Sequence, residues 1–184
     1  MSLMSDIDVL EAMERGEIGI EPFDKKFLGP DSLDIRLGTG MLVSKTIGKT
    51  IDPVKPDNFF ESREIDGSFT LEPGQFVLGT TFERISLSDS VSAQIEGRSS
   101  LGRLGIMVHM TAGIIHAGFG AKEPSALTLE IYSVNPNSVY LHAGMKIAQL
   151  SFFRLNRKAS KGYDFMPTSK YVHQDRPLAP KAEK

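Results

Sequence analysis

Hydrophobic and polar residues alternate over residues 125–132, and this alternation predicts a β-strand with two different faces. The apolar face carries Leu127, Leu129 and Ile131. The polar face carries Thr128, Glu130 and Tyr132. Because charge is seldom buried without a partner, we expect the apolar face in the core and Glu130 among polar groups.

The same two-residue period occurs over residues 32–37. It places Leu33, Ile35 and Leu37 on one face and Ser32, Asp34 and Arg36 on the other. An Asp and an Arg two apart on a strand most often form an ion pair with each other, and this is the interpretation adopted for Asp34 and Arg36.

A helical period is confined to the start of the chain. Ser5 and Asp8 resemble a capping pair, and apolar residues recur three apart until Gly16, which predicts a helix over residues 6–15. Residues 44–68 mix Lys, Asp, Pro and Gly and predict a long loop between short strands. Residues 1–3 precede a second methionine, and we expect them to be an expression scar.

One turn-plus-strand unit occurs twice, at residues 71–77 and 141–147. Leu and Gly match in both copies, and Phe-x-Arg follows each at the same offset, as Phe82-x-Arg84 and Phe152-x-Arg154. Short runs rich in Val, Ile, Thr and Phe, punctuated by Gly and Pro, favour a mainly β fold of the Greek-key or jelly-roll barrel type. With 184 residues, we expect a single domain over 1–184.

The block of residues 94–133 holds most of the candidate chemistry. Residues 97–105 predict the end of a strand, a turn rich in hydroxyl groups and one helical turn. A helix start flanked by Arg98 and Arg103 can stabilise an anion, of which phosphate is the most plausible. The alternative for this turn is a capped turn with solvated arginines. The alternative for Glu130 is a strand carboxylate paired with an arginine.

Composition excludes several classes of function. The chain has no cysteine and four scattered histidines, and it lacks the H-x-E and P-C-x-x-C motifs, so zinc chemistry is disfavoured. No G-x-x-x-x-G-K-[ST] loop and no G-x-S-x-G elbow occurs. A net charge of -2 disfavours nucleic-acid partners. No apolar run is long enough for a membrane span and no signal peptide is visible, so we expect a cytoplasmic protein.

The residues after Asn156 are polar, with too few apolar side chains for a core of their own. They include aromatic and basic side chains suited to covering a ligand. We therefore expect residues 157–184 to form a tail that acts as a lid.

Residues 97–112 together with a later L-E-I-Y strand and a C-terminal Y-x6-K-x3-Q pattern resemble the dCTP deaminase branch of the trimeric dUTPase-like superfamily. The likeness runs from the Ser5 helix to Gln174, and the glycine-rich arm of plain dUTPases is missing. The resemblance implies a dUTPase-like distorted β-barrel. It also implies zinc-independent deamination of dCTP to dUTP and ammonia in a homotrimer, with sites between subunits and Mg²⁺ on the triphosphate.

The resemblance also implies roles for individual residues. Glu130 would transfer protons, Ser99 and the Ala112 carbonyl would hold the water, and Arg103 would orient Glu130. Arg98, Ser100, Lys170 and Gln174 would bind phosphates. Tyr163 would cover the sugar and base. The remaining positions that match the substrate site are Leu101, Gly102, His116, Thr128 and Leu129.

His116 stands where the family usually has an aspartate, and the segment from there to Glu130 is a few residues longer. In relatives that also cleave dUTP, that aspartate is tied to the 3′-hydroxyl and the hydrolytic water. An imidazole cannot replace a carboxylate as acceptor of both hydrogen bonds, so we expect no hydrolysis to dUMP. Two alternatives stay open, a dUTP diphosphatase or bifunctional enzyme that releases dUMP and pyrophosphate, and a nucleotide-sensing trimer without turnover. Inhibition by dTTP is a further possibility within the family.

Overall fold

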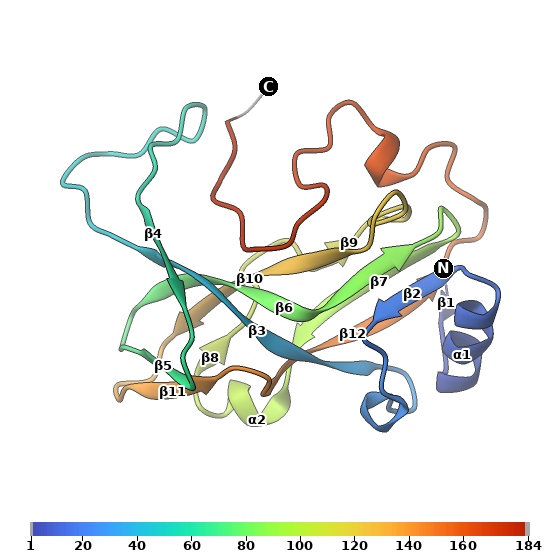
Figure 1. Ribbon diagram of the computed structural model, residues 1–184, viewed down its shortest axis with the longest axis horizontal. Helices are drawn as coiled ribbons and strands as arrows, with labels where there is room; N and C mark the ends of the chain where they lie inside the picture. The colour runs from blue at the N-terminus through green and yellow to red at the C-terminus, as the bar shows by residue number, and fades with distance from the viewer. Residues whose placement is uncertain (1, 183–184) are drawn as a thin grey trace.

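The computed structural model describes residues 2–182, and β-strands make up most of its regular structure (Figure 1). Within these residues only one helix, α1, is longer than a single turn. The elements are, in chain order, β1 (Ser2–Leu3), α1 (Asp6–Glu14), β2 (Ile18–Glu21), η1 (Lys25–Phe27), β3 (Leu33–Ser44), β4 (Phe60–Glu64), β5 (Ser68–Leu71), β6 (Phe76–Leu87), β7 (Val91–Gly97), α2 (Ser99–Gly102), β8 (Ile106–Met107), β9 (Ile114–Ile115), β10 (Ser125–Ser133), β11 (Val139–His142), β12 (Lys146–Arg154) and η2 (Tyr163–Phe165).

Ten strands form one antiparallel sheet with the central order β8-β10-β6-β3-β12-β7-β9. Strands β1, β2 and β4 join it at β12, β6 and β3, and β5 pairs with β11 in a separate two-stranded sheet. The large sheet curls into a half-barrel. The predicted mainly β fold class is therefore confirmed, in an open form and not as a closed barrel.

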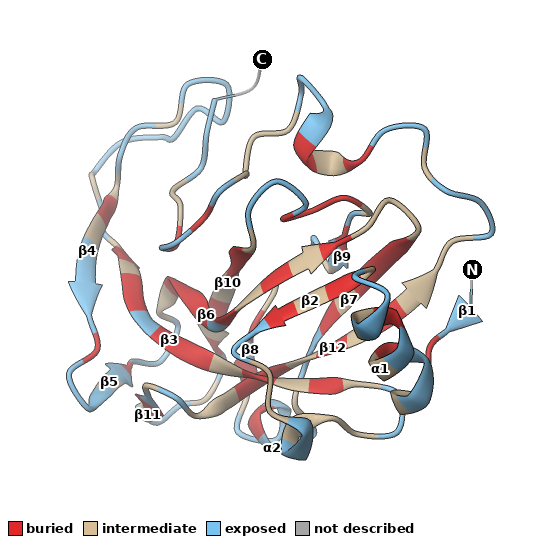
Figure 2. Ribbon diagram, turned by 45° about the vertical axis from the view of Figure 1, so that its right-hand side comes forward, coloured by how far each residue is buried: buried red, intermediate tan, exposed pale blue. Residues whose placement is uncertain are grey.

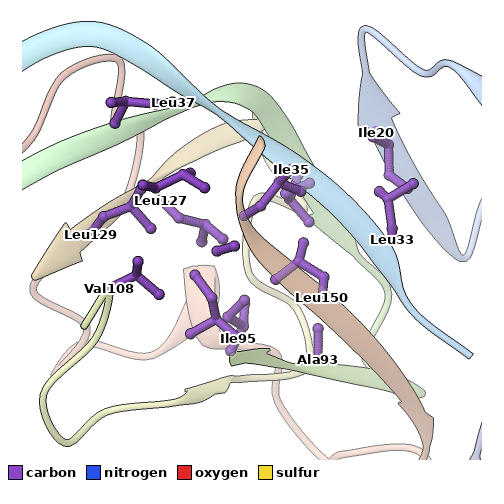
Figure 3. Close-up of a cluster of buried hydrophobic side chains, with 14 of the residues drawn as sticks. Ile20, Leu33, Ile35, Leu37, Ala93, Ile95, Val108, Leu127, Leu129 and Leu150 are labelled. Atoms are coloured by element: carbon purple, nitrogen blue, oxygen red, sulfur yellow. The ribbon is translucent and has the colours of Figure 1, made fainter. Parts of the chain in front are cut away.

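The core lies inside the curl, where apolar side chains from β3, β7, β10 and β12 meet (Figure 3). Ile35, Leu129 and Leu150 are fully buried there. The alternation predicted for β10 is confirmed, because its apolar positions are buried and Glu130 on the other face is partly exposed. Along β3, buried and partly exposed residues alternate at both ends, and the pattern is interrupted in the middle, around Gly38 and Gly40 (Figure 2).

Asp34 and Arg36 do not pair with each other, so that interpretation was wrong. Asp34 accepts hydrogen bonds from Arg98 Nε at 3.0 Å and Lys146 Nζ at 2.8 Å. Arg36 Nε donates to Glu83 Oε1 at 2.6 Å. Both side chains reach across to groups on other elements, because better partners are available there than along the same strand.

The repeated unit seen in the sequence is a real structural repeat. The two copies begin on β5 and β11, which pair with each other, and both pass through a glycine with positive φ, Gly74 at 70° and Gly144 at 77°. The similarity does not extend to the phenylalanines of the two Phe-x-Arg motifs, because Phe152 is fully buried whereas Phe82 is 49% exposed.

The predicted N-terminal helix is confirmed as α1, and Ser5 and Asp8 form a reciprocal capping box. Ser2 and Leu3 pair with Arg154 and Phe153 of β12, whereas Met1 lies outside the described residues. The predicted loop of residues 44–68 contains β4, which pairs with β3. No helix among residues 2–182 is long and apolar enough to cross a membrane.

The chain after β12 folds back over the sheet, with η2 and the final segment at the upper edge of Figure 1. Residues 157–182 contain no strand. The Ala126 N–H donates to the Gln174 carbonyl at 2.8 Å, and Pro177 lies close to Gly40. The tail is thus attached to β10 and β3, whereas its last two residues lie outside the described part of the chain.

Candidate active site

A cavity of about 390 Å³ opens between β10, the segment 109–119 and the tail. It is placed there because β10 turns its polar face away from the core while the tail crosses in front of that face. Six of the predicted site residues line it, namely Ala112, His116, Thr128, Glu130, Tyr163 and Gln174. The structure therefore brings part of the predicted site together from three separate segments.

Glu130 is fixed on one side only. Its Oε2 accepts a hydrogen bond from the Met110 N–H at 2.8 Å, and its own N–H donates to the Val108 carbonyl at 3.0 Å. Oε1 has no recorded partner among the described residues. A carboxylate held through one oxygen can present the other to a water molecule or to a substrate nitrogen, which is the geometry that general acid and base catalysis requires.

His109 also lines the cavity and was not predicted as a site residue. Its Nδ1 is buried with no hydrogen-bond partner among the described residues, and its Nε2 lies 3.4 Å from Glu96 Oε2. The Gln94 amide, and after it His109, hold the pKa of Glu96 below its usual range. Periodicity could not single out His109, because it follows β8 in a segment without regular structure.

The rings of His116 and Tyr163 stack with centroids 5.7 Å apart and planes 16° from parallel. His116 follows β9, whereas Tyr163 begins η2 in the tail. Phe119 lies against the same tyrosine, with ring centroids 5.9 Å apart. The residue that departs from the family pattern therefore forms part of the cavity wall together with the predicted lid residue.

Phenylalanine side chains and the end of the tail form an apolar part of the lining, and two of them, Phe59 and Phe60, lie in the segment 44–68 that was predicted to be a loop. Phe59 and Phe60 pack with centroids 4.4 Å apart, and Phe60 lies 6.3 Å from Phe76. Leu178 and Pro180 of the tail line the cavity as well. No local pattern marks these positions, since they meet only after the chain has folded.

The predicted anion-binding turn has the expected local structure. Arg98 is the N-cap of α2 and makes no side-chain capping bond, and Arg103 donates to the Ser99 hydroxyl. None of the described residues that line the cavity comes from residues 98–103 (Figures 1 and 2 place α2 at the lower edge). Within one chain, the arginine-rich turn and the Glu130 cavity are separate clusters.

Arg98 is nevertheless held in a defined orientation. Asp34, with 13% of its side chain exposed, binds Arg98 through Nε and Lys146 through Nζ. An arginine bound through Nε keeps the two terminal nitrogens of its guanidinium group for a second partner. This arrangement contradicts the interpretation of Arg98 as a freely solvated side chain on a capped turn.

Several predicted contacts are not made within the chain. Leu129 is fully buried in the core, so its side chain does not line the cavity, because neighbouring positions on a strand face opposite sides. Leu101 of α2 is buried, and Gly102, Ser100 and Lys170 do not line the cavity either. The recorded partner of Arg103 is Ser99, and the Glu130 carboxylate is held by a backbone N–H and not by an arginine.

Residues 2–182 contain no group of three or more His, Cys, Asp or Glu side chains that could hold a metal ion.

The fold matches that of a nucleotide deaminase. The crystal structure of 2′-deoxycytidine 5′-triphosphate deaminase from Agrobacterium tumefaciens superposes with a TM-score of 0.62 and 22% sequence identity, over 82% of this chain and 46% of that one. The chain thus spans about half the length of that protein. The match confirms the predicted dUTPase-like architecture at the level of the fold.

Sequence comparison identifies the family. The family model described as dCTP deaminase-like matches residues 3–155. The dCTP deaminase, dUMP-forming, of Dictyoglomus thermophilum is 42% identical over 96% of this chain and 93% of its own length. The dCTP deaminase of Haloarcula marismortui is 39% identical over 98% and 95%. The chain belongs to the dCTP deaminase family, so the resemblance and the prediction of an enzyme are confirmed.

Proposed function

We propose that this protein deaminates dCTP and that Glu130 is the group that transfers protons. The observation that carries the proposal is the Glu130 carboxylate in the cavity wall, fixed through Oε2 by the Met110 N–H. In the proposed reaction a water molecule adds to C4 of the cytosine, and Glu130 takes a proton from it. Protons are then delivered to N3 and to the amine, which leaves as ammonia.

The turn at residues 98–103 is proposed to act on the substrate of a neighbouring subunit. It lies outside its own chain's cavity, yet it presents two arginines and two hydroxyls that the resemblance assigns to phosphate and water binding. A homotrimer with shared sites would bring Ser99 and Arg103 of one copy to Glu130 of another. Arg98, oriented by Asp34, would contact the triphosphate through its terminal nitrogens, with Ser100 beside it.

The tail is proposed to cover the bound nucleotide, with Tyr163 over the sugar and base and with Lys170 and Gln174 near the phosphates. Tyr163 and Gln174 already line the cavity. Mg²⁺ bound by the triphosphate would neutralise part of its charge. The chemistry at C4 requires no step at that ion, because Glu130 supplies the proton transfers.

We further propose that the product is dUMP, in place of the dUTP expected from the sequence. The support is the name of the Dictyoglomus relative, a dUMP-forming enzyme at 42% identity. Arrest at dUTP is the second candidate, and His116 favours it, because Glu130 is the only carboxylate among the described residues that line the cavity. Under the first candidate, the imidazole of His116 would accept the proton of the hydrolytic water.

One assay separates these possibilities. The protein is incubated with Mg²⁺ and dCTP, and in a second reaction with Mg²⁺ and dUTP, while ammonia and pyrophosphate are measured. Ammonia and pyrophosphate together from dCTP support the dUMP-forming enzyme, and ammonia alone supports arrest at dUTP. Pyrophosphate from dUTP without ammonia from dCTP identifies a diphosphatase. Binding of dCTP with neither product identifies a nucleotide sensor and contradicts the proposal.

A further inference from the structure

Asp164 is a buried carboxylate beside the cavity, and the reaction proposed above gives it no role. Only 5% of the residue is exposed. It follows Tyr163 in η2, and its side chain forms no ion pair within residues 2–182. Burying a carboxylate is costly unless it is fully hydrogen-bonded, so the contacts that Asp164 makes must serve a specific part of the structure.

Those contacts are two backbone N–H groups of one loop. Asp164 Oδ1 accepts from the Gly120 N–H at 3.2 Å, and Oδ2 accepts from the Lys122 N–H at 3.2 Å. The loop belongs to the segment between His116 and Glu130, for which the resemblance implied extra residues in this chain. The carboxylate thus connects the tail to the segment that follows β9.

The backbone around Asp164 lies against the same segment. The Tyr163 N–H donates to the Ala117 carbonyl at 2.8 Å, and the Asp164 N–H donates to the Gly118 carbonyl at 3.2 Å. Gly118 has a φ of 81°, and a Cβ there would lie 2.3 Å from the Gly162 Cα. The two stretches of backbone therefore touch directly, and a side chain at Gly118 would force them apart.

Two side-chain contacts extend this junction. The Lys122 ammonium lies 4.9 Å from the centre of the Phe165 ring, and His173 Nδ1 lies 3.3 Å from Glu123 Oε2. Both of these contacts are exposed and contribute little by themselves. The two hydrogen bonds of Asp164 are buried or partly buried, and they form the part of the junction best protected from water.

We propose that Asp164 is a positioning residue of the active site, which holds the Tyr163 ring against His116 by binding the two amides of the 120–122 loop. This inference rests on the proposed function, because it takes the His116–Tyr163 wall to be a surface that the substrate contacts. Asp164 does not touch the substrate. It fixes the distance between the tail and the segment after β9, and with it the width of the cavity at the stacked rings.

Asp164→Asn is the most informative variant, since it keeps the shape of the side chain. An amide offers one acceptor oxygen and places an NH₂ donor opposite the second backbone N–H, so one of the two hydrogen bonds is lost. The KM for dCTP should rise about tenfold while kcat stays within about threefold, because the wall is displaced and the proton-transferring Glu130 is not. Hydrogen exchange of the amides at residues 118–124 should become faster.

The matched control is Asp89→Asn. Asp89 pairs with Lys158 at 3.1 Å where the tail begins, and this pair does not line the cavity. The KM of Asp89→Asn for dCTP should match that of the parent. In a Tyr163→Ala background, the effect of Asp164→Asn on KM should fall below about twofold, because Asp164 acts through Tyr163.

Other outcomes would overturn the inference. A merely structural Asp164 would lower the thermal midpoint and the active fraction, so kcat would fall at an unchanged KM. If the parent releases no ammonia from dCTP, the proposed function fails. The positioning role of Asp164 is then tested separately, by calorimetric measurement of dCTP binding to the parent and to Asp164→Asn. Affinity about tenfold weaker in the variant supports the positioning role. Equal affinity, or no dCTP binding by the parent, rejects it.

Discussion

The Thr128 hydroxyl donates a 2.9 Å hydrogen bond to Gln174 Oε1, which joins the strand that carries Glu130 to the C-terminal tail. Gln174 is only 5% exposed, and the Leu178 N–H donates to the same threonine oxygen at 3.3 Å. The tail is therefore docked onto β10 at the edge of the cavity.

Thr128→Val should loosen this docking, because valine keeps the branched shape but leaves a buried amide oxygen without its donor, at a cost of about 1–3 kcal/mol. Faster hydrogen exchange and faster proteolysis at residues 171–178 are the expected results. Thr128→Ser keeps the hydroxyl and serves as the control. Unchanged exchange in the valine variant would show that other contacts hold the tail.

Glu130→Gln should abolish ammonia release from dCTP while leaving dCTP affinity within several-fold of the parent. The amide keeps the size of the side chain but cannot take up and deliver protons. Single-turnover ammonia release and calorimetric binding measure the two effects. Glu61→Gln, at a partly exposed carboxylate on β4 outside the cavity, is the control and should behave as the parent. Substantial ammonia release by Glu130→Gln would remove this residue from catalysis.

Mixing two inactive variants should restore activity. If Glu130 and Arg103 of one site come from different subunits, Glu130→Gln and Arg103→Ala chains that exchange subunits will form some intact sites, about a quarter of the total at equal mixing. Ammonia release after co-refolding checks this, and each variant refolded alone is the control. Failure to recover activity in mixed trimers would place both residues in sites formed by one chain.

His116→Asp should raise the rate of pyrophosphate release from dUTP. A carboxylate is a firmer acceptor for the hydrolytic water than an imidazole, and a well-placed general base contributes roughly 10²–10⁴-fold. His116→Asn is the control, since it changes size without supplying a base. An equal rise with asparagine would assign the effect to space in the cavity and not to basicity.

Glu17→Gln should destabilise the protein near neutral pH and lose this effect in acid. Hydrogen bonds from Arg154, the nearer at 2.9 Å, hold the pKa of Glu17 below its usual range. A depressed carboxylate pKa adds stability that is present above about pH 4.5 and lost as the pH falls through the folded-state value. The Glu17–Arg154 pair is partly exposed, so we expect the variant to lose up to about 1 kcal/mol of unfolding free energy.

Thermal unfolding of parent and Glu17→Gln at about pH 7 and pH 3 tests this, and the two midpoints should converge at the lower pH. Glu14→Gln, at an exposed position of α1, should match the parent throughout. If the thermal midpoints of Glu17→Gln and the parent differ as much in acid as at neutral pH, the loss of stability comes from the shape of the side chain and not from its charge.

The sequence alone determined the features that depend on local chemistry. The alternation of β10 indicated which side of Glu130's strand is buried, and the Ser5 capping box marked the start of α1. The repeated glycine turns at Gly74 and Gly144 also followed from local pattern, since their positive φ favours residues without a Cβ. The motif at residues 97–112 was specific enough to indicate the family that the relatives confirm.

Only the tertiary structure decided which partners meet across the chain. Asp34 pairs with Arg98 and not with Arg36. His109 lines the cavity, and its buried Nδ1 has no hydrogen-bond partner among the described residues. Asp164 binds a loop 42 or more positions away. Such contacts depend on how strands and tail are brought together in space, and neither period nor spacing encodes this. Local rules fix the conformation of a segment, whereas long-range packing selects its neighbours.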